Sequence, residues 1–132
     1  EVIDDPNANK SAVDTLVFCS GKFYYEASEK AAEMGVDNMA FVRLEQLYPL
    51  PKKQITELIA SYPAAKNLVW AQEEPENMGA WKYMAMELRN LDLKGVYRKA
   101  SAAAAEGSSS LHKKRLKRLF EDLFQFANVT AK

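Results

Sequence analysis

The sequence predicts an α/β domain of three layers, in which helices cover both faces of a mainly parallel sheet. Short apolar segments rich in strand-forming residues occur at residues 15–19, 39–44 and 67–71. Each is followed by a segment whose apolar residues recur every three to four positions, the spacing of an amphipathic helix. Alternation of this kind along 132 residues is typical of a single α/β domain.

The helices are predicted from their apolar faces and from the residues that end them. One is expected over residues 22–34, because Gly35 can end it. Another is expected between Pro51, which suits a first helical turn, and Pro63, which stops the helix. The apolar faces are, in chain order, Phe23, Ala27 and Ala31; Ile55, Leu58, Ile59 and Tyr62; Trp81, Met84, Ala85 and Leu88; and Leu116, Leu119, Phe120 and Leu123.

We expect residues 1–13 to form a linker or N-terminal extension and residues 14–132 to form one domain. Residues 4–7, DDPN, are of the types that favour turns, and the segment lacks the apolar periodicity of a helix or strand. The chain begins with Glu1 rather than Met, and its first ten residues carry three acids, unlike a signal or transit peptide. We therefore expect it to be a fragment of a longer chain. Residues 94–99 are expected to add a fourth strand, and residues 73–79 to form an acidic loop.

Several classes of protein are excluded by composition. No apolar run approaches the roughly 18 residues that a membrane-spanning helix needs, so no membrane is expected as a partner. Cys19 is the only cysteine, which rules out an internal disulfide and favours a reducing compartment. Its place in an apolar run favours a buried strand residue over a reactive thiol.

The charge of the chain is zero overall but unevenly distributed. Residues 1–93 hold nine Lys or Arg against fifteen Asp or Glu, whereas residues 94–118 hold eight against one. A basic segment of this kind usually faces an anionic ligand or an acidic surface. No aromatic residues interleave with the basic ones in residues 112–118, so nucleic acid is not expected as a partner.

No catalytic constellation is evident in the sequence. His112 is the only histidine, and zinc sites typically need three or four ligands. There is no P-loop, no G-x-G-x-x-G and no G-x-S-x-G. Glu73, Glu74 and Glu76 follow a predicted strand. Such a cluster is most often a solvated or interface loop, although loops after strand ends also gather ligands in α/β sheets.

Residues around the start of the last helix are candidates for an anion site. Arg98 and Lys99 precede Ser108, and a helix N-terminus offers free N–H groups and the positive end of the helix dipole. Ser108 and its two neighbours are equally suited to be plain helix caps. Both interpretations stay open at this point.

Three segments carry a more specific signal: LVFCSGK at residues 16–22, RLEQLYP at residues 43–49 and WAQEEPENMGAW at residues 70–81. Together they resemble the C-terminal end of the 2-oxoglutarate dehydrogenase first component, from about Asp14 to Phe124. Related transketolase-like domains share the strand–Gly–helix layout but lack this combination. The tail departs from the family pattern, because Tyr97 and Ala104 stand where Gly and Pro are usual.

The resemblance implies a transketolase C-terminal-domain-like fold within a larger enzyme of the citric acid cycle. That enzyme decarboxylates 2-oxoglutarate on thiamine diphosphate and passes the succinyl group to a lipoyl-bearing succinyltransferase. Thiamine diphosphate and magnesium would be held by other domains, with no cofactor or metal bound by this fragment. The parent would be a homodimer, located in the bacterial cytoplasm or, in a eukaryote, in the mitochondrial matrix.

The resemblance also suggests roles for particular residues. Some relatives bind an adenine-containing effector, acetyl-CoA or AMP, near this domain, which makes Arg98, Lys99, Ser101 and Ser108 the candidates here. Residues 73–81 supply candidates for contacts with other domains or a second subunit, namely Glu73, Glu74, Asn77 and Trp81.

Three hypotheses follow from these observations. The first is a structural and regulatory domain, inactive alone, of the decarboxylating component. The alternatives are a stand-alone nucleotide- or acetyl-CoA-binding module and the equivalent domain of another thiamine-dependent dehydrogenase.

Overall fold

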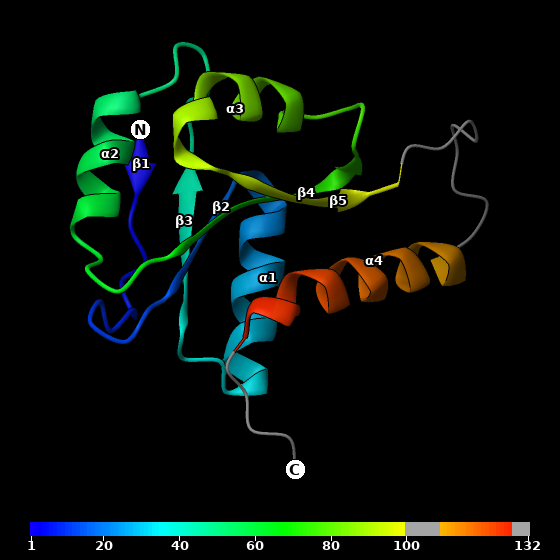
Figure 1. The fold of residues 1–132 in the computed structure, drawn as a ribbon. Coiled ribbons are helices and arrows are strands. Elements are labelled where there is room, and N and C mark those ends of the chain that lie inside the picture. The colour runs from blue at the N-terminus through cyan, green and yellow to red at the C-terminus, as the bar shows by residue number, and fades with distance from the viewer. Residues whose placement is uncertain (100–108, 128–132) are drawn as a thin grey trace.

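The computed structural model describes residues 1–99 and 109–127, and in them a five-stranded sheet lies between two pairs of helices (Figure 1). The strands are β1 (Val2–Ile3), β2 (Thr15–Cys19), β3 (Met39–Leu44), β4 (Asn67–Pro75) and β5 (Lys94–Arg98). The α-helices are α1 (Gly21–Met34), α2 (Lys52–Ala60), α3 (Trp81–Glu87) and α4 (Ser109–Leu123). Two short 3-10 helices follow α3 and α4, at Arg89–Leu91 and Phe124–Phe126.

The sheet has the order β1-β3-β2-β4-β5. β2 pairs in parallel with both β3 and β4, and β4 pairs in parallel with β5. Only the short β1 runs antiparallel to its neighbour, β3, among the strands of the described residues. The predicted α/β class with a mainly parallel sheet is therefore confirmed, as is the fourth predicted strand.

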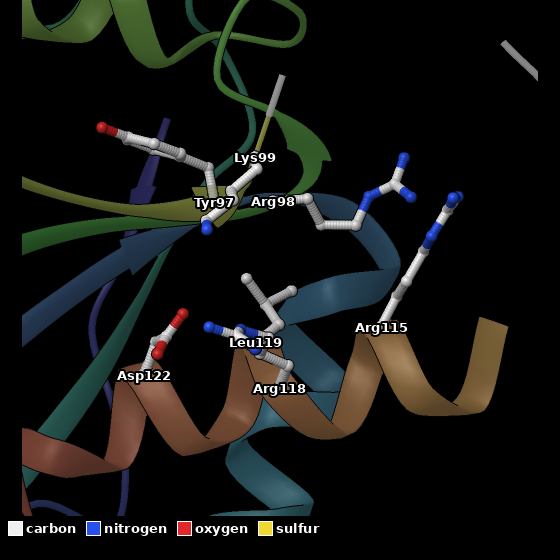
Figure 2. Close-up of a pocket in the computed structure, with 7 residues that line it drawn as sticks. All are labelled: Tyr97, Arg98, Lys99, Arg115, Arg118, Leu119 and Asp122. Carbon is white, nitrogen blue, oxygen red and sulfur yellow. The ribbon is translucent and has the colours of Figure 1, made fainter. Parts of the chain in front are cut away.

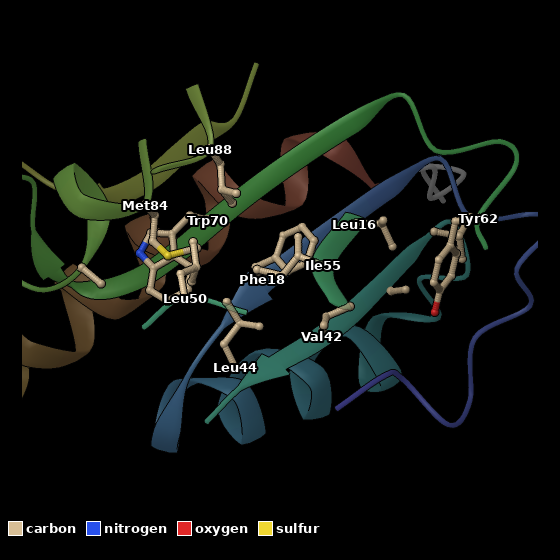
Figure 3. Close-up of a cluster of buried hydrophobic side chains, with 13 residues drawn as sticks. Leu16, Phe18, Val42, Leu44, Leu50, Ile55, Tyr62, Trp70, Met84 and Leu88 are labelled. Atoms are coloured by element: carbon tan, nitrogen blue, oxygen red, sulfur yellow. The ribbon is translucent and has the colours of Figure 1, made fainter. Parts of the chain in front are cut away.

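Two hydrophobic clusters, one on each face of the sheet, hold the layers together. α1 and α4 pack on one face, where Phe23 and Leu119 meet Val17 of the central strand. α2 and α3 pack on the other, where Ile55 and Met84 join a cluster around Phe18 and Trp70 (Figure 3). Because successive residues of a strand point to opposite faces, one strand supplies both clusters.

The central strand β2 is buried along its whole length, as expected for a parallel strand covered on both faces. Cys19 ends this strand and is fully buried. Burial disfavours the charged thiolate and raises the pKa of Cys19 to about 12. The interpretation of Cys19 as a buried strand residue is confirmed.

β4 is longer than the sequence indicates. We expected a strand over residues 67–71 and an acidic loop from Glu73, but the strand continues through Pro75. Its pairing with β5 shifts register after Ala71 and resumes at Pro75, opposite Arg98. The loop prediction is therefore wrong for residues 73–75. Proline and acidic residues are common in turns, which is why the sequence suggested a loop. In the structure β4 extends past the end of β2 and has no neighbouring strand on that side, and proline is tolerated at such an edge.

Residues 1–13, which we expected to be a linker or N-terminal extension, contain β1 and several contacts with the sheet. Val2 and Ile3 pair with Leu44 and Arg43 of β3. The backbone N–H of Phe41, two residues before Arg43 in β3, donates to the Asp5 carboxylate at 3.0 Å. The segment thus satisfies backbone groups that β3 would otherwise present as an open sheet edge. A two-residue strand has no periodicity of its own, so sequence patterns could not indicate it.

Within the described ranges, no helix combines the length and the apolar character that crossing a membrane requires.

Asp4 provides a test of how the first residues dock. Its carboxylate accepts a hydrogen bond from the Tyr62 hydroxyl and forms an ion pair with Lys10 at 2.8 Å. Partial burial alone would raise the pKa of Asp4. These partners outweigh it and hold the pKa below its ordinary value of 3.8. A depressed folded-state pKa contributes stability above the unfolded pKa, and that stability is lost as pH falls through the folded value.

We therefore expect Asp4→Asn to lower the free energy of unfolding by less than about 1 kcal/mol at neutral pH, since the pair is partly exposed and screened. The difference between the two proteins should shrink as pH falls below about 3.8, measured by urea denaturation at several pH values. Asp37→Asn, at an exposed site, is the matched control. A difference that stays constant from pH 7 to pH 3 would contradict this account.

Candidate functional site

A basic groove of about 420 Å³ lies between the end of β5 and α4 (Figure 2). We use the name basic groove for the space bounded by Tyr97, Arg98, Lys99, Arg115, Arg118, Leu119 and Asp122. Four of these side chains are cationic and one is a carboxylate. The cations of the groove therefore come from both ends of the basic segment at residues 94–118.

Alternation along β5 decides which side chains face the groove. Val96 is buried in the cluster under α1 and α4, so Arg98, two residues on, lies on the same side of the strand. Tyr97 lies between them, and its ring extends away from α4 (Figure 2). That ring packs 5.4 Å from the ring of Trp81, and its hydroxyl donates to the Glu76 carboxylate at 3.3 Å. The Tyr97 ring consequently leaves the basic groove open.

Helical spacing aligns the groove residues of α4. Arg115, Arg118 and Asp122 recur at intervals of three and four, so they share one side of the helix. Leu119 lies on the same side, is buried, and fixes the helix on the sheet. Arg115 and Arg118 were considered only as part of the basic run at residues 112–118, and Asp122 was not predicted as a site residue. Their spacing beside the apolar face that includes Leu119 is the signal that could have identified them.

Arg98 is held in place by the extended end of β4. Its Nε donates to the carbonyl oxygen of Glu73 at 2.9 Å, and its own carbonyl oxygen accepts from the N–H of Glu76 at 2.9 Å. The Glu73 carboxylate in turn lies 3.9 Å from Nε2 of His112, near the start of α4. We predicted Arg98 and Glu73 as members of two separate sites, but the structure places them in contact.

The other predicted site residues are distributed around this contact. Lys99 is exposed at the edge of the basic groove. Glu74 and Asn77 are exposed on residues 73–79, which we call the acidic segment. Trp81 is half-buried and packs closely on β5: a Cβ on Gly95 would lie 2.9 Å from the Trp81 ring. Ser101 and Ser108, the remaining candidates for the anion site, lie outside the described residues.

The side-chain amide of Gln72 organises the acidic segment, a role that sequence reasoning missed. Its Oε1 accepts from the indole N–H of Trp70 at 2.8 Å and from the backbone N–H of Trp81 at 2.9 Å. Its Nε2 donates to the carbonyl oxygens of Pro75 at 2.9 Å and Met78 at 2.8 Å. Gln72 is buried, and its one side chain gives a hydrogen-bond partner to each of these four groups.

A second cleft, of about 400 Å³, lies at the carboxyl ends of β2 and β4. The chain runs from β2 to β3 on one side and then to β4 on the other, so the strand order reverses here. Crevices at such reversals are common binding positions in α/β sheets. Glu73 and Glu74 line this cleft together with Lys22 and Tyr48. The acidic segment therefore lines this cleft and also accepts a hydrogen bond from Arg98, which lines the basic groove.

The basic groove is suited to binding an anion. Arginine guanidinium groups match phosphate oxygens in a two-pronged geometry, and lysine adds a point charge. In the ranges that the structure describes, no group of three or more His, Cys, Asp or Glu residues is arranged to hold a metal ion. The chemistry that this groove supports is recognition of a phosphate or carboxylate group.

Fold and groove together define an α/β domain with a cation-lined groove at one end of its sheet. The chain belongs to the 2-oxoglutarate dehydrogenase C-terminal family, whose model matches residues 1–124. It is 40% identical over 120 residues to a 2-oxoglutarate dehydrogenase E1 component from Azotobacter vinelandii, covering 85% of this chain and 13% of that protein.

Two further relatives show the breadth of the similarity. The 2-oxoglutarate dehydrogenase E1 component of Geobacillus sp. (strain WCH70) is 37% identical over 119 residues, covering 86% of this chain and 12% of that protein. A probable 2-oxoadipate dehydrogenase complex component E1 homolog from Dictyostelium discoideum is 35% identical over 132 residues, covering 95% of this chain and 15% of that protein. The chain thus spans 12–15% of the length of these three relatives.

We expect Gln72→Leu to lower the free energy of unfolding by roughly 3 kcal/mol, because it removes the acceptor of the buried Trp70 indole N–H and of the partly buried Trp81 backbone N–H. Urea denaturation followed by tryptophan fluorescence would measure this loss. Gln46→Leu is the matched control: Gln46 is exposed and its hydrogen bond, at 3.5 Å, is long. Its effect should stay within about 0.5 kcal/mol. Equal stability of the two variants would show that the Gln72 network does not stabilise the fold.

Proposed function

We propose that the chain is the C-terminal structural and regulatory domain of a 2-oxoglutarate dehydrogenase decarboxylating component, with a transketolase C-terminal-domain-like fold. The observation that carries this proposal is the family match over residues 1–124, together with relatives named as E1 components. The three-layer fold supports it, since helices on both faces of a mainly parallel sheet are what the resemblance implies. The parent enzyme would decarboxylate 2-oxoglutarate and succinylate a lipoyl carrier.

The regulatory part of the proposal rests on the basic groove. We infer that it binds the phosphate groups of an adenine-containing effector, acetyl-CoA or AMP. Arg98 and Arg115 extend their guanidinium groups to the same end of the groove (Figure 2), and Arg118 and Lys99 line the same space. Asp122 is the one acceptor among the charged lining residues, and it suits a ligand that also carries an N–H or O–H donor.

We propose, as the family resemblance implies, that thiamine diphosphate and magnesium are held by other parts of the longer enzyme. We derive no chemical step through them here.

The structural part of the proposal concerns the acidic segment. Glu73 and Glu74 line the second cleft, and Glu74 and Asn77 are exposed. We infer that this edge contacts other domains of the same enzyme or a second subunit of a homodimer. The lipoyl-bearing succinyltransferase would be a partner of the assembled enzyme.

Effector binding can be tested by calorimetry with AMP, acetyl-CoA and inorganic pyrophosphate. We expect the double variant Arg115→Ala/Arg118→Ala to weaken nucleotide binding at least about tenfold, since each guanidinium–phosphate contact is charge-assisted. Arg89→Ala, at an exposed arginine outside the basic groove, is the matched control and should bind as the unaltered chain does.

The three ligands separate the outcomes of that experiment. Binding of AMP and acetyl-CoA but not pyrophosphate supports an adenine-containing effector. Equal affinity for all three would reduce the proposal to a general anion site. No heat with any ligand at millimolar concentration would remove the effector role from this chain.

The assignment of catalysis to the rest of the enzyme gives a separate prediction. The purified 132-residue chain, supplied with thiamine diphosphate and magnesium, should release no CO₂ from 2-oxoglutarate above the rate in buffer. A coupled CO₂ assay measures this directly. A turnover that depends on the chain would contradict the proposal.

A further inference from the structure

We propose that a groove between α1 and α4, on the outer side of that helix layer, docks an acidic amphipathic helix of a protein partner. The groove has a volume of about 400 Å³ and is distinct from the basic groove, which α4 forms with β5. We call it the lysine-rimmed groove. This inference does not depend on the proposed function, because a different surface and different residues carry it.

The floor of the lysine-rimmed groove is apolar and supported by the core. Leu116, Phe120 and Phe124 line it from α4 and the short helix after it, and all three are half-buried. The Phe120 ring lies 5.9 Å from that of Phe124 and stacks 5.8 Å from that of the buried Phe23 beneath. Because Phe23 anchors it, the floor is held in shape without a ligand. Met34, at the end of α1, completes the floor and is 37% exposed.

Three lysines surround this floor. Lys113 and Lys117 lie one turn apart on α4, and Lys30 lies on α1. Among the described residues, Lys113 and Lys117 form no ion pair within 4 Å, whereas Lys30 lies 3.9 Å from Glu33. Glu121 is the one acid in the lining. The rim is therefore net positive, and a ligand with acids beside an apolar stripe complements it.

The shape of the site favours a helix as the ligand. Leu116, Phe120 and Phe124 recur every four residues along α4 and the short helix after it, so the floor is an apolar stripe that follows one helix. A partner helix can pack on such a stripe with its own apolar residues at i, i+3, i+4 and i+7. Acids flanking that stripe would reach the lysines on both sides, since α1 contributes one and α4 the other two. A nucleotide would gain little here, because the floor is apolar and the cations lie at its edges.

The probe for the experiment is a labelled synthetic peptide of about 18 residues, long enough to form a helix when bound. It carries leucines at i, i+3, i+4 and i+7 and glutamates on both flanks. Fluorescence anisotropy at low salt should show saturable binding to the 132-residue chain. The double variant Lys113→Glu/Lys117→Glu should weaken binding at least about tenfold, and Met34→Glu, at an exposed position, should also weaken it.

The matched control is Lys53→Glu/Lys82→Glu. It makes the same change of charge on α2 and α3, which cover the opposite face of the sheet. This variant should bind the peptide within about twofold of the unaltered chain. Circular dichroism checks that each variant folds, and Met34→Glu remains a single-site test if the double variant does not.

Four results would overturn the proposal. The first is no binding up to millimolar peptide, and the second is equal binding by the groove and control variants. The third is equal affinity for a scrambled peptide of the same composition. The fourth is a self-associated chain that Lys113→Glu/Lys117→Glu makes monomeric, because the occupant would then be a second copy.

Discussion

The buried side-chain amide of Gln72 is the interaction on which the functional end of this domain depends. β4 continues past the end of β2, so its last residues lose one neighbouring strand and would leave polar groups unpaired. Gln72 pairs groups from the strand, from the following turn and from the first residue of α3. Hydrogen bonds that are buried away from water are strong, and a buried group left unpaired lowers the free energy of unfolding. Gly79 is part of the same constraint: it has a φ of +66°, and a Cβ there would lie 3.0 Å from Gln72 Oε1.

The hydrogen bonds of Gln72 hold the acidic segment, and that segment contacts Arg98 of the basic groove. By extending β4 to Pro75, these hydrogen bonds place the carbonyl oxygen of Glu73 where Arg98 can donate to it. Arg98 in turn borders the groove that α4 completes with Arg115 and Arg118. Arg98 therefore contacts both regions: its Nε donates to the acidic segment, and its side chain lines the basic groove.

Much of the fold could be predicted because the relevant information is local. The run from Thr15 to Cys19 is continuously apolar since both of its faces are covered, and such a run identifies a central parallel strand. The helix predicted at residues 22–34 was identified by its apolar face, and it ends at Gly35, which has a φ of +70°. β1 could not be identified in this way, because two residues become a strand only when β3 provides a partner. Residues 73–75 were misassigned for a related reason: their composition favours a turn, and pairing with β5 overrides it.

The sequence alone determined the family resemblance, the alternation of strands and helices, and the concentration of positive charge after residue 94. Each of these is a property of neighbouring residues or of their spacing. Only the tertiary structure decided which cations share a groove, since Arg98 and Arg115 are brought together by packing α4 against β5. It also decided that Glu73 belongs beside Arg98 and that Gln72 holds the acidic segment in place. These relations depend on the distance between elements in space, and no pattern along one segment records that distance.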